Sequence, residues 1–260
     1  MPAAYELVLT ELKDGVLVVT LNDPARRNPL STPMREQLID VLAAAAADDA
    51  VRVLVLTGAD GAFSSGGDLS AMPPASREDS DERMDRVRTL VQLVAGSAKP
   101  TIAALEGPAA GISVGLAAAC DVVIMAEGAK ALFPFTRLGL LPDGGLMGSL
   151  SHRIGRSAAK RVLLLGNPVG TAEALALGLA DEAAPAGAAL HRALDTAVVL
   201  AGRAPQSLAA VKEFFAAGRL EVGDALAAEQ RIQRELYFSQ DFAEGKSAFF
   251  GGREPRFTGN

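Results

Sequence analysis

The sequence predicts an α/β fold, in which helices cover a sheet of mostly parallel strands, because three observations agree. Short apolar, β-branched runs alternate with longer segments of helical periodicity up to about residue 200. The turn Lys13-Asp14-Gly15 joins the first two runs as a hairpin, whereas helices separate the later runs, which should therefore pair in parallel. Beyond residue 200 the chain has helical patterns only. We expect a core at 1–200 and a C-terminal helical region at 201–260.

Each element follows from a local signal. The first helix should begin after Ser31, because a serine can cap a helix and Pro33 suits its first turn. Residues 111–119 are small and almost wholly apolar, which indicates a tightly buried helix. The strands are expected at 5–10, 16–21, 52–57, 101–105 and 121–125, and the further helices at 81–94, from 204, at 221–238 and at 241–250.

The composition limits the partners that we expect. The 260 residues carry a net charge of -6 without a block of Lys and Arg, which argues against nucleic acid and an anionic membrane and favours a small ligand. The single cysteine, Cys120, lies in an alanine-rich run and should be a buried, reduced thiol. There is no leader pattern and no apolar stretch of membrane-spanning length, so we expect a cytoplasmic protein. His152 and His191 have no partner at ligand spacing, so no metal is expected.

A glycine-rich loop at 56–69 is the strongest local signal of a binding site. It follows an apolar strand, and its paired glycines, Gly66 and Gly67, permit positive φ and a close approach of a ligand to backbone N–H groups. Asp68 is typical of a helix N-cap, and a helix N-terminus favours a developing negative charge. A glycine-rich turn that binds nothing would use the same residues, so both interpretations stay open at this point.

Further motifs surround this loop over nearly the whole chain. They are Asp-Pro-Ala-Arg-Arg-Asn-Pro-Leu at 23–30, Lys-Pro-Thr-Ile-Ala-Ala-Leu-Glu-Gly-Pro-Ala-Ala-Gly at 99–111, Ala-Cys-Asp at 119–121, Leu-Gly-Leu-Leu-Pro-Asp-Gly-Gly at 138–145, and the tail at 241–249 and 253–259. In order and spacing the chain resembles the crotonase (enoyl-CoA hydratase/isomerase) superfamily. The resemblance implies a spiral of ββα units with a C-terminal region that trimerises and covers a neighbouring active site, as a homotrimer or a dimer of trimers. A helical subdomain with a core of its own is the alternative.

The resemblance also assigns the catalytic machinery. Two backbone N–H groups, here those of Gly67 and Ile112, would form an oxyanion hole for the thioester oxygen and stabilise an enolate. The two glutamates that hydratases use correspond to Gly115 and Phe135, so hydration by the usual route is disfavoured. Asp143 is the acid that remains nearby, and it matches the region where isomerases of this superfamily carry their acid. Asp143 could instead be only a helix N-cap.

Binding residues are carried over in the same way. Coenzyme A would enter as part of the acyl-CoA substrate, with no tightly bound cofactor. Its contacts are expected from Arg26, Arg27, Pro29, Leu30, Ala62, Ser64 and Ser65, and from Phe249 and Arg253 of a neighbouring chain. The acyl pocket is expected to use Phe63, Leu69, Met72, Phe135 and Leu141.

We therefore expect an enoyl-CoA isomerase that moves a double bond from C3 to C2 with Asp143 as its base. Two alternatives stay open. One is a hydratase or another crotonase reaction with an unconventional base, and the other is a non-catalytic acyl-CoA-binding protein.

Overall fold

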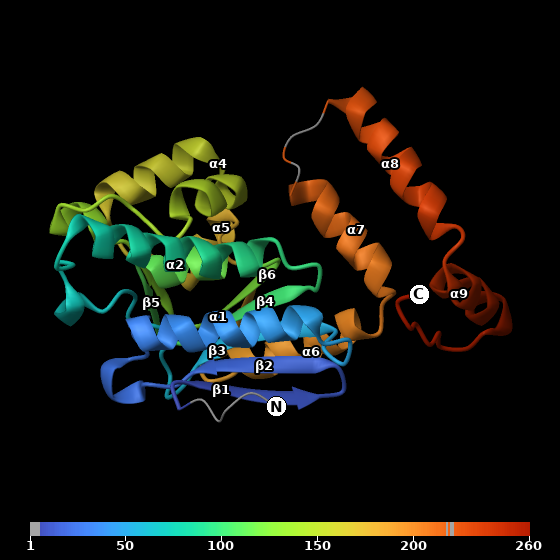
Figure 1. The fold of residues 1–260 in the computed structure, drawn as a ribbon, viewed down its shortest axis with the longest axis horizontal. Coiled ribbons are helices and arrows are strands. Elements are labelled where there is room, and N and C mark those ends of the chain that lie inside the picture. Colours follow the sequence, from blue (N-terminus) through green and yellow to red (C-terminus); the bar gives the residue numbers. More distant parts are fainter. Residues whose placement is uncertain (1–5, 217, 219–220) are drawn as a thin grey trace.

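The computed structural model describes residues 6–216, 218 and 221–260, so Tyr5, at the start of the first expected strand, lies outside the described part (Figure 1). Its strands are β1 (Val8–Lys13), β2 (Val16–Leu21), β3 (Val53–Gly58), β4 (Thr101–Leu105), β5 (Pro108–Ala110), β6 (Val122–Ala126), β7 (Lys130–Leu132), β8 (Val169–Gly170) and β9 (Glu182–Ala184). The helices are α1 (Thr32–Ala47), α2 (Arg77–Ala95), α3 (Ile112–Ala118), α4 (Leu146–Leu165), α5 (Thr171–Leu177), α6 (Ala189–Ala201), α7 (Pro205–Ala216), α8 (Val222–Leu236) and α9 (Gln240–Gly251). Short 3-10 helices are η1 (Pro24–Arg26), η2 (Leu69–Ala71) and η3 (Phe135–Leu138).

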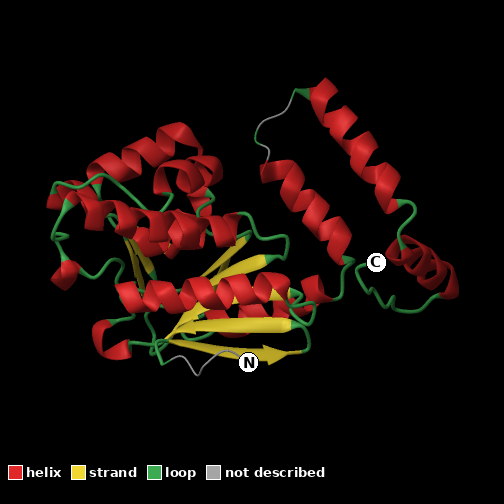
Figure 2. Ribbon diagram, in the orientation of Figure 1, coloured by secondary structure: helices red, strands yellow, loops and turns green. Residues whose placement is uncertain are grey.

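The main sheet has the strand order β1-β2-β3-β4-β6-β9, and a smaller sheet has the order β5-β7-β8 (Figure 2). Only β1 and β2 pair antiparallel in the main sheet, and the later neighbours are parallel. The hairpin turn at Asp14 and Gly15 has φ of 50° and 80°, as a two-residue hairpin requires. The α/β prediction and its mainly parallel pairing are confirmed.

The core lies between this sheet and the helices on it. Parallel strands that are covered on both faces are apolar throughout, and β4 is buried at every residue. Helix α6 contacts β2, β3, β4 and β6, while α1 packs beside α2. The predicted burial of α3 is confirmed at all of its residues, and the adjacent Cys120 is buried, which raises the pKa of its thiol to about 12. The thiol therefore stays protonated at neutral pH and is a structural group.

Helix α2 begins earlier than the sequence analysis predicted. Ser76 caps it, because its side chain accepts a hydrogen bond from the Asp79 N–H, and Glu78 and Asp79 occupy the positive N-terminal turn. Only Val87, Leu90 and Val94 of α2 are buried.

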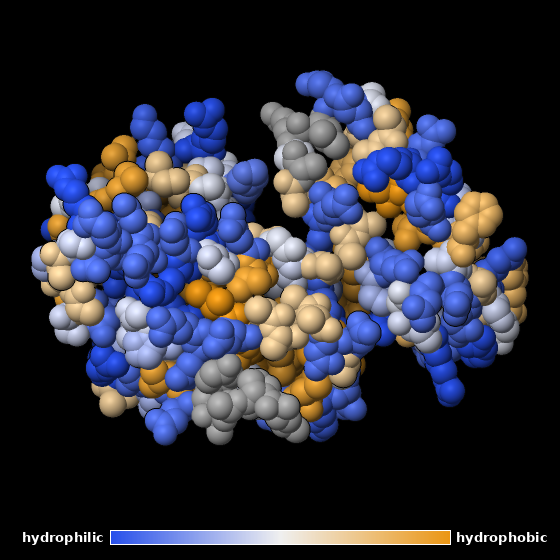
Figure 3. All heavy atoms as spheres, viewed as in Figure 1, coloured by the Kyte–Doolittle hydropathy of each residue, from blue (hydrophilic) through white to orange (hydrophobic). Residues whose placement is uncertain are grey.

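The C-terminal helices do not form a core of their own. None of the described residues of α7 and α8 is buried, and Phe215 and Phe238 are 74% and 87% exposed. Figure 3 shows apolar side chains on the surface of this region. Within one chain, α7 and α8 bury no described residue, which argues against the alternative of a self-contained helical subdomain.

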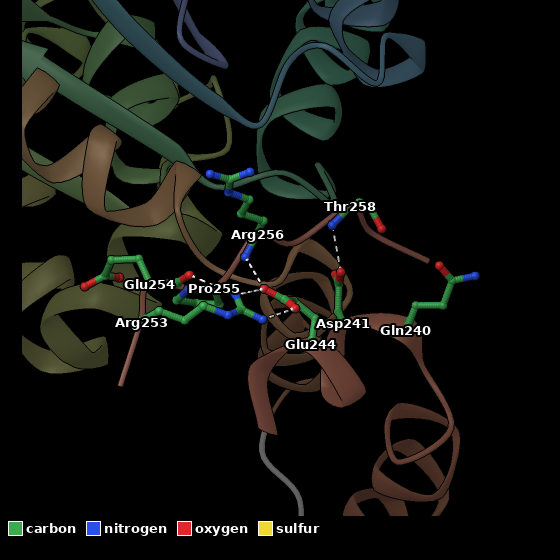
Figure 4. Close-up of a pocket in the computed structure, with 8 residues that line it drawn as sticks. All are labelled: Gln240, Asp241, Glu244, Arg253, Glu254, Pro255, Arg256 and Thr258. Carbon is green, nitrogen blue, oxygen red and sulfur yellow. Dashed lines mark hydrogen bonds and ion pairs between the residues drawn. The ribbon is translucent and has the colours of Figure 1, made fainter. Parts of the chain in front are cut away.

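The C-terminal tail is instead tied back by carboxylates of α9 (Figure 4). Asp241 is 3% exposed, and its side chain accepts hydrogen bonds from the Thr258 N–H at 2.7 Å and the Gly259 N–H at 2.9 Å. Arg52, which precedes β3, donates to the Phe257 carbonyl oxygen at 3.2 Å. These bonds connect α9, the tail and the edge of the core.

A second carboxylate, that of Glu244, lines the same pocket as Asp241, between α9 and the tail (Figure 4). It accepts hydrogen bonds from the Arg253 guanidinium at 2.6 and 2.8 Å and from the Arg256 N–H at 2.8 Å. Arg253 and the Arg256 N–H hold the pKa of the Glu244 carboxyl down at about 2. Glu244 therefore stays ionised over the whole physiological range.

We expect Asp241→Ala to loosen the tail. Hydrogen bonds to a charged acceptor contribute ~1.5–3 kcal/mol each, so amide exchange of Thr258 and Gly259 should accelerate at least tenfold. Hydrogen exchange read by mass spectrometry on 255–260 measures this. Glu254→Ala is the matched control, since the Glu254 carboxylate makes no ion pair or hydrogen bond among the described residues. Equal protection in Asp241→Ala and Glu254→Ala would refute the role of Asp241.

No helix within the described residues is long and apolar enough to cross a membrane.

Candidate active site

The loop after β3 is held by close backbone packing. Gly66 has φ of +89°, and a Cβ atom there would lie 2.4 Å from the Ala110 carbonyl oxygen. The Ser64 hydroxyl accepts a hydrogen bond from the Gly66 N–H, and the Ser64 carbonyl accepts one from the Ala110 N–H at 3.0 Å. The predicted capping by Asp68 is confirmed at η2, where its carboxylate accepts from the Ser70 N–H. The loop therefore presents Gly67 beside β5.

A second turn brings another N–H group to the same place. Gly111 has φ of +54° and donates to the Leu132 carbonyl oxygen, and Ile112 then starts α3. The Ser113 hydroxyl, fully buried, lies within hydrogen-bond distance of the Ser64 carbonyl at 3.2 Å and so links the two turns. Among the hydrogen bonds of the described residues, none uses the N–H of Gly67 or of Ile112. Two backbone donors are thus available at the same cavity.

The cavity between these turns has a volume of about 70 Å³. It combines apolar walls with the two donors, one arginine and one carboxylate. The residues that line it are Ser65, Gly66, Gly67, Leu69, Met72, Arg83, Val87, Gly111, Ile112, Pro134, Phe135, Leu138, Leu140 and Asp143.

Asp143 enters this cavity because its loop lies directly on α3. A Cβ atom at Gly144, where φ is +65°, would be 2.6 Å from Ile112 Cγ1, and one at Gly115 would be 2.1 Å from the Gly144 carbonyl oxygen. Helix α4 begins at Leu146 and has Gly145 as its N-cap residue, without a side-chain cap. The alternative that Asp143 is only a helix N-cap is therefore wrong.

The surroundings of Asp143 favour a proton acceptor of raised basicity. Burial raises the pKa of its carboxyl, against the opposing positive charges of Arg83 and Arg35. Desolvation is the largest cause, so the net direction is upward. A carboxylate in this environment accepts a proton more readily than an exposed aspartate does.

The two positions at which the resemblance implies the hydratase glutamates, 115 and 135, hold no proton-transfer group. Gly115 faces the Gly144 carbonyl, so no side chain fits there without a shift of the loop. Phe135 is 6% exposed, lines the cavity, and has its ring 3.4 Å from where a Cβ of Gly111 would be. Within the cavity, Asp143 is the carboxylate available for proton transfer.

Three of the five residues expected in the acyl pocket line the cavity, namely Leu69, Met72 and Phe135. The other two do not. Phe63 is fully buried in the hydrophobic core. Leu141 is 75% exposed and lines a separate groove beside α4. Phe63 and Leu141 are therefore not part of this cavity.

The model of the family described as enoyl-CoA hydratase/isomerase matches residues 11–260. The chain belongs to this family. It is 34% identical to 1,2-epoxyphenylacetyl-CoA isomerase and 34% identical to 2,3-dehydroadipyl-CoA hydratase, both of Escherichia coli K12, with 98% of this chain and 99% of each relative covered. The crystal structure of an enoyl-CoA hydratase from Polaromonas sp. JS666 superposes with a TM-score of 0.91 at 32% identity, covering 96% of this chain and 99% of that one.

Of the residues expected to contact coenzyme A in this enoyl-CoA hydratase/isomerase family member, those at 26–30 and 62–65 lie together near the cavity, and several of them use their polar atoms in internal contacts. Arg26 pairs with Asp23 and Asp68, and Leu30 donates to the Gly66 carbonyl. Ala62, Ser64, Pro29 and Leu30 are buried, whereas Arg26, Arg27 and Ser65 are exposed. Among these residues, the exposed Arg27 and Ser65 are therefore the ones that a ligand at the surface can reach most directly.

Phe249 and Arg253 lie far from these residues. They belong to α9 and the tail, at the opposite end of the molecule from η2 and the loop before α2 (Figure 1). Phe249 is 81% exposed, and Arg253 pairs with Glu244. Within one chain they do not contact the cavity.

Sequence analysis missed Arg83 and Arg35. Arg83 lines the cavity, and Arg35 is fully buried on α1, where it donates to the Leu30 carbonyl oxygen at 2.9 Å. The Leu30 N–H in turn donates a hydrogen bond to the Gly66 carbonyl oxygen. To find Arg83 from the sequence, one would have needed to know where α2 begins, at its cap Ser76, and which face of that helix lies against the cavity. Among the described residues, no group of His, Cys, Asp and Glu is placed to hold a metal.

Proposed function

We propose that this family member is an enoyl-CoA isomerase that moves a double bond from C3 to C2, with Asp143 as its only base. The observation that supports it is one carboxylate of raised pKa in a cavity that also has two unused backbone donors. The relatives named above include both a hydratase and an isomerase, so membership of the family leaves the reaction open.

The reaction needs one base and one anion site. Asp143 takes a proton from C2, the C2–H electron pair passes into a dienolate, and the negative charge develops on the thioester oxygen. The N–H groups of Gly67 and Ile112 stabilise this oxygen. Asp143 then returns the proton to C4, which leaves the double bond between C2 and C3. No second acid is required, which agrees with glycine and phenylalanine at 115 and 135.

The direct experiment supplies the pure protein with 3-hexenoyl-CoA and, separately, with 2-hexenoyl-CoA. Chromatography of the products should show 2-hexenoyl-CoA formed from the first substrate and no 3-hydroxyhexanoyl-CoA from the second. Formation of the hydroxy product would support a hydratase with an unconventional base. Tight binding of 3-hexenoyl-CoA without conversion would support a non-catalytic binder, and either result would overturn the isomerase proposal.

We further propose that the chain assembles as a homotrimer or a dimer of trimers through its C-terminal region. The exposed aromatic side chains of α7 to α9 support this assembly, since a lone chain would leave them in water. Phe249 and Arg253 would then lie over the residues of a neighbouring chain that are expected to contact coenzyme A. A molar mass of a single chain in light scattering would contradict this proposal.

A further inference from the structure

Arg83 is an unpaired cation inside the cavity. It is half-buried, and its Nη2 atom lies 3.3 Å from the position that a Cβ atom of Gly67 would take. Neighbouring arginines of α2 are paired, Arg86 with Glu36 and Glu82, and Arg88 with Asp85. The Arg83 guanidinium makes no hydrogen bond or ion pair within the described part of the chain. Its donors are therefore free to bind a ligand in the cavity that Arg83 lines.

Asp143 does not neutralise the positive charge of Arg83 through an ion pair. Arg83 and Asp143 line the same cavity and interact through their charges, but they form no ion pair. Arg35, fully buried, adds a second positive charge that acts on Asp143. The charges of both arginines act on the one carboxylate of the cavity, so positive charge exceeds negative charge among these three groups.

An apolar acyl group would be a poor occupant of such a cavity. Leu69, Met72 and Val87 offer it apolar contacts, but it would remove water from the Arg83 guanidinium and supply no acceptor. Burying a polar group without a partner carries a penalty, whereas a guanidinium and a carboxylate can form two parallel hydrogen bonds. The excess charge and the unpaired donors both favour an anionic group on the substrate.

We propose that the acyl group of the substrate ends in a carboxylate and that Arg83 binds it, so that Arg83 determines specificity for acidic acyl-CoA thioesters. This proposal rests on the proposed isomerase function, because it names the class of substrate that binds in the same cavity. The carboxylate also balances the two arginines and Asp143. An enoyl-CoA with an uncharged chain of the same length would bind more weakly and turn over more slowly.

The test measures binding, which needs no reaction. Dissociation constants of saturated malonyl-, succinyl-, glutaryl- and hexanedioyl-CoA are compared by calorimetry with those of the uncharged acyl-CoAs of equal chain length. At least one acidic member should bind about tenfold or more tightly than its uncharged counterpart, the range for a charge-assisted pair. Arg83→Met should abolish this ratio while leaving the affinity for the uncharged acyl-CoA within about twofold. Arg86→Met, which removes a paired arginine one turn further along α2, should keep the ratio.

The outcomes separate the two proposals. A preference that is lost in Arg83→Met supports the acidic substrate class even if no 3-enoyl-CoA is isomerised, in which case the isomerase proposal alone fails. Equal binding of acidic and uncharged acyl-CoAs at every length, or a preference that survives Arg83→Met, overturns the role of Arg83. An equal loss for both kinds of ligand, with the acid limb of the activity profile moved to higher pH, would mean that Arg83 acts only on Asp143, and it also overturns the proposal.

Discussion

Asp143→Asn should lower kcat for 3-enoyl-CoA isomerisation by ~10²- to 10⁴-fold, the usual contribution of a general base. Asparagine has nearly the same shape but cannot accept the proton from C2. The N–H groups of Gly67 and Ile112 stay in place, so the affinity for a saturated acyl-CoA should change by less than about threefold. Stopped-flow or steady-state rates with calorimetric affinities measure both quantities.

The control for Asp143→Asn is Asp60→Asn, which removes one carboxylate from an exposed position in the loop after β3. Asp60 has φ of 53°, which asparagine tolerates well, so this variant should keep full activity. If Asp143→Asn also kept full activity, Asp143 would not be the base even if the protein were an isomerase.

The pH dependence of kcat should show the state of the same carboxyl. Asp143 must be ionised to take the proton, and burial raises its pKa. Activity should therefore be lost, as pH falls, at a higher pH than an exposed aspartate would give, and it should be constant above that limb. An acid limb at or below the range of an ordinary aspartate would contradict the geometry of the site.

The second large effect is expected from Gly66→Ala. At φ of +89° an added Cβ atom would lie 2.4 Å from the Ala110 carbonyl oxygen, so the loop must move away from β5. Gly67 then loses its alignment with Ile112, and removal of one oxyanion donor typically lowers kcat ~10²- to 10³-fold. Steady-state kinetics and thermal unfolding of the same samples measure the loss of rate and of stability.

Gly61→Ala separates this steric effect from the cost of positive φ alone. Gly61 lies in the same loop at φ of +71°, but a Cβ atom there has nothing within 4 Å. The substitution should reduce stability by about 1–2 kcal/mol and leave the rate nearly unchanged. Equal losses of kcat in Gly61→Ala and Gly66→Ala would show that the contact with Ala110 does not control the donor.

Local signals in the sequence predicted most of the fold. The turn at Asp14 and Gly15, the cap at Ser31 and the small residues of α3 act over a few residues, and their structures follow from propensity and sterics. The backbone donors were predictable for a related reason. A glycine motif specifies a backbone path, and the path carries the N–H groups whatever the side chain at 112.

The rest depends on packing between distant segments. Whether Phe63 or Leu140 faces the cavity is decided by the rotation of a loop against its neighbours, which spacing along the chain does not reveal. Arg83 looked like any surface charge of a polar helix until the helix was placed beside Gly67. Gly145 is the N-cap residue of α4 and the Asp143 side chain makes no cap hydrogen bond, although its place before two glycines is typical of a cap.

The close approach of the Gly144 carbonyl to Gly115 limits which single substitutions this site can accept. A glutamate at 115 would place its Cβ atom 2.1 Å from that carbonyl oxygen, so this substitution cannot be accommodated without a change in the loop. The loop that holds Asp143 would have to withdraw to admit that side chain. The same backbone packing therefore positions Asp143 and leaves no room for a second acid at 115.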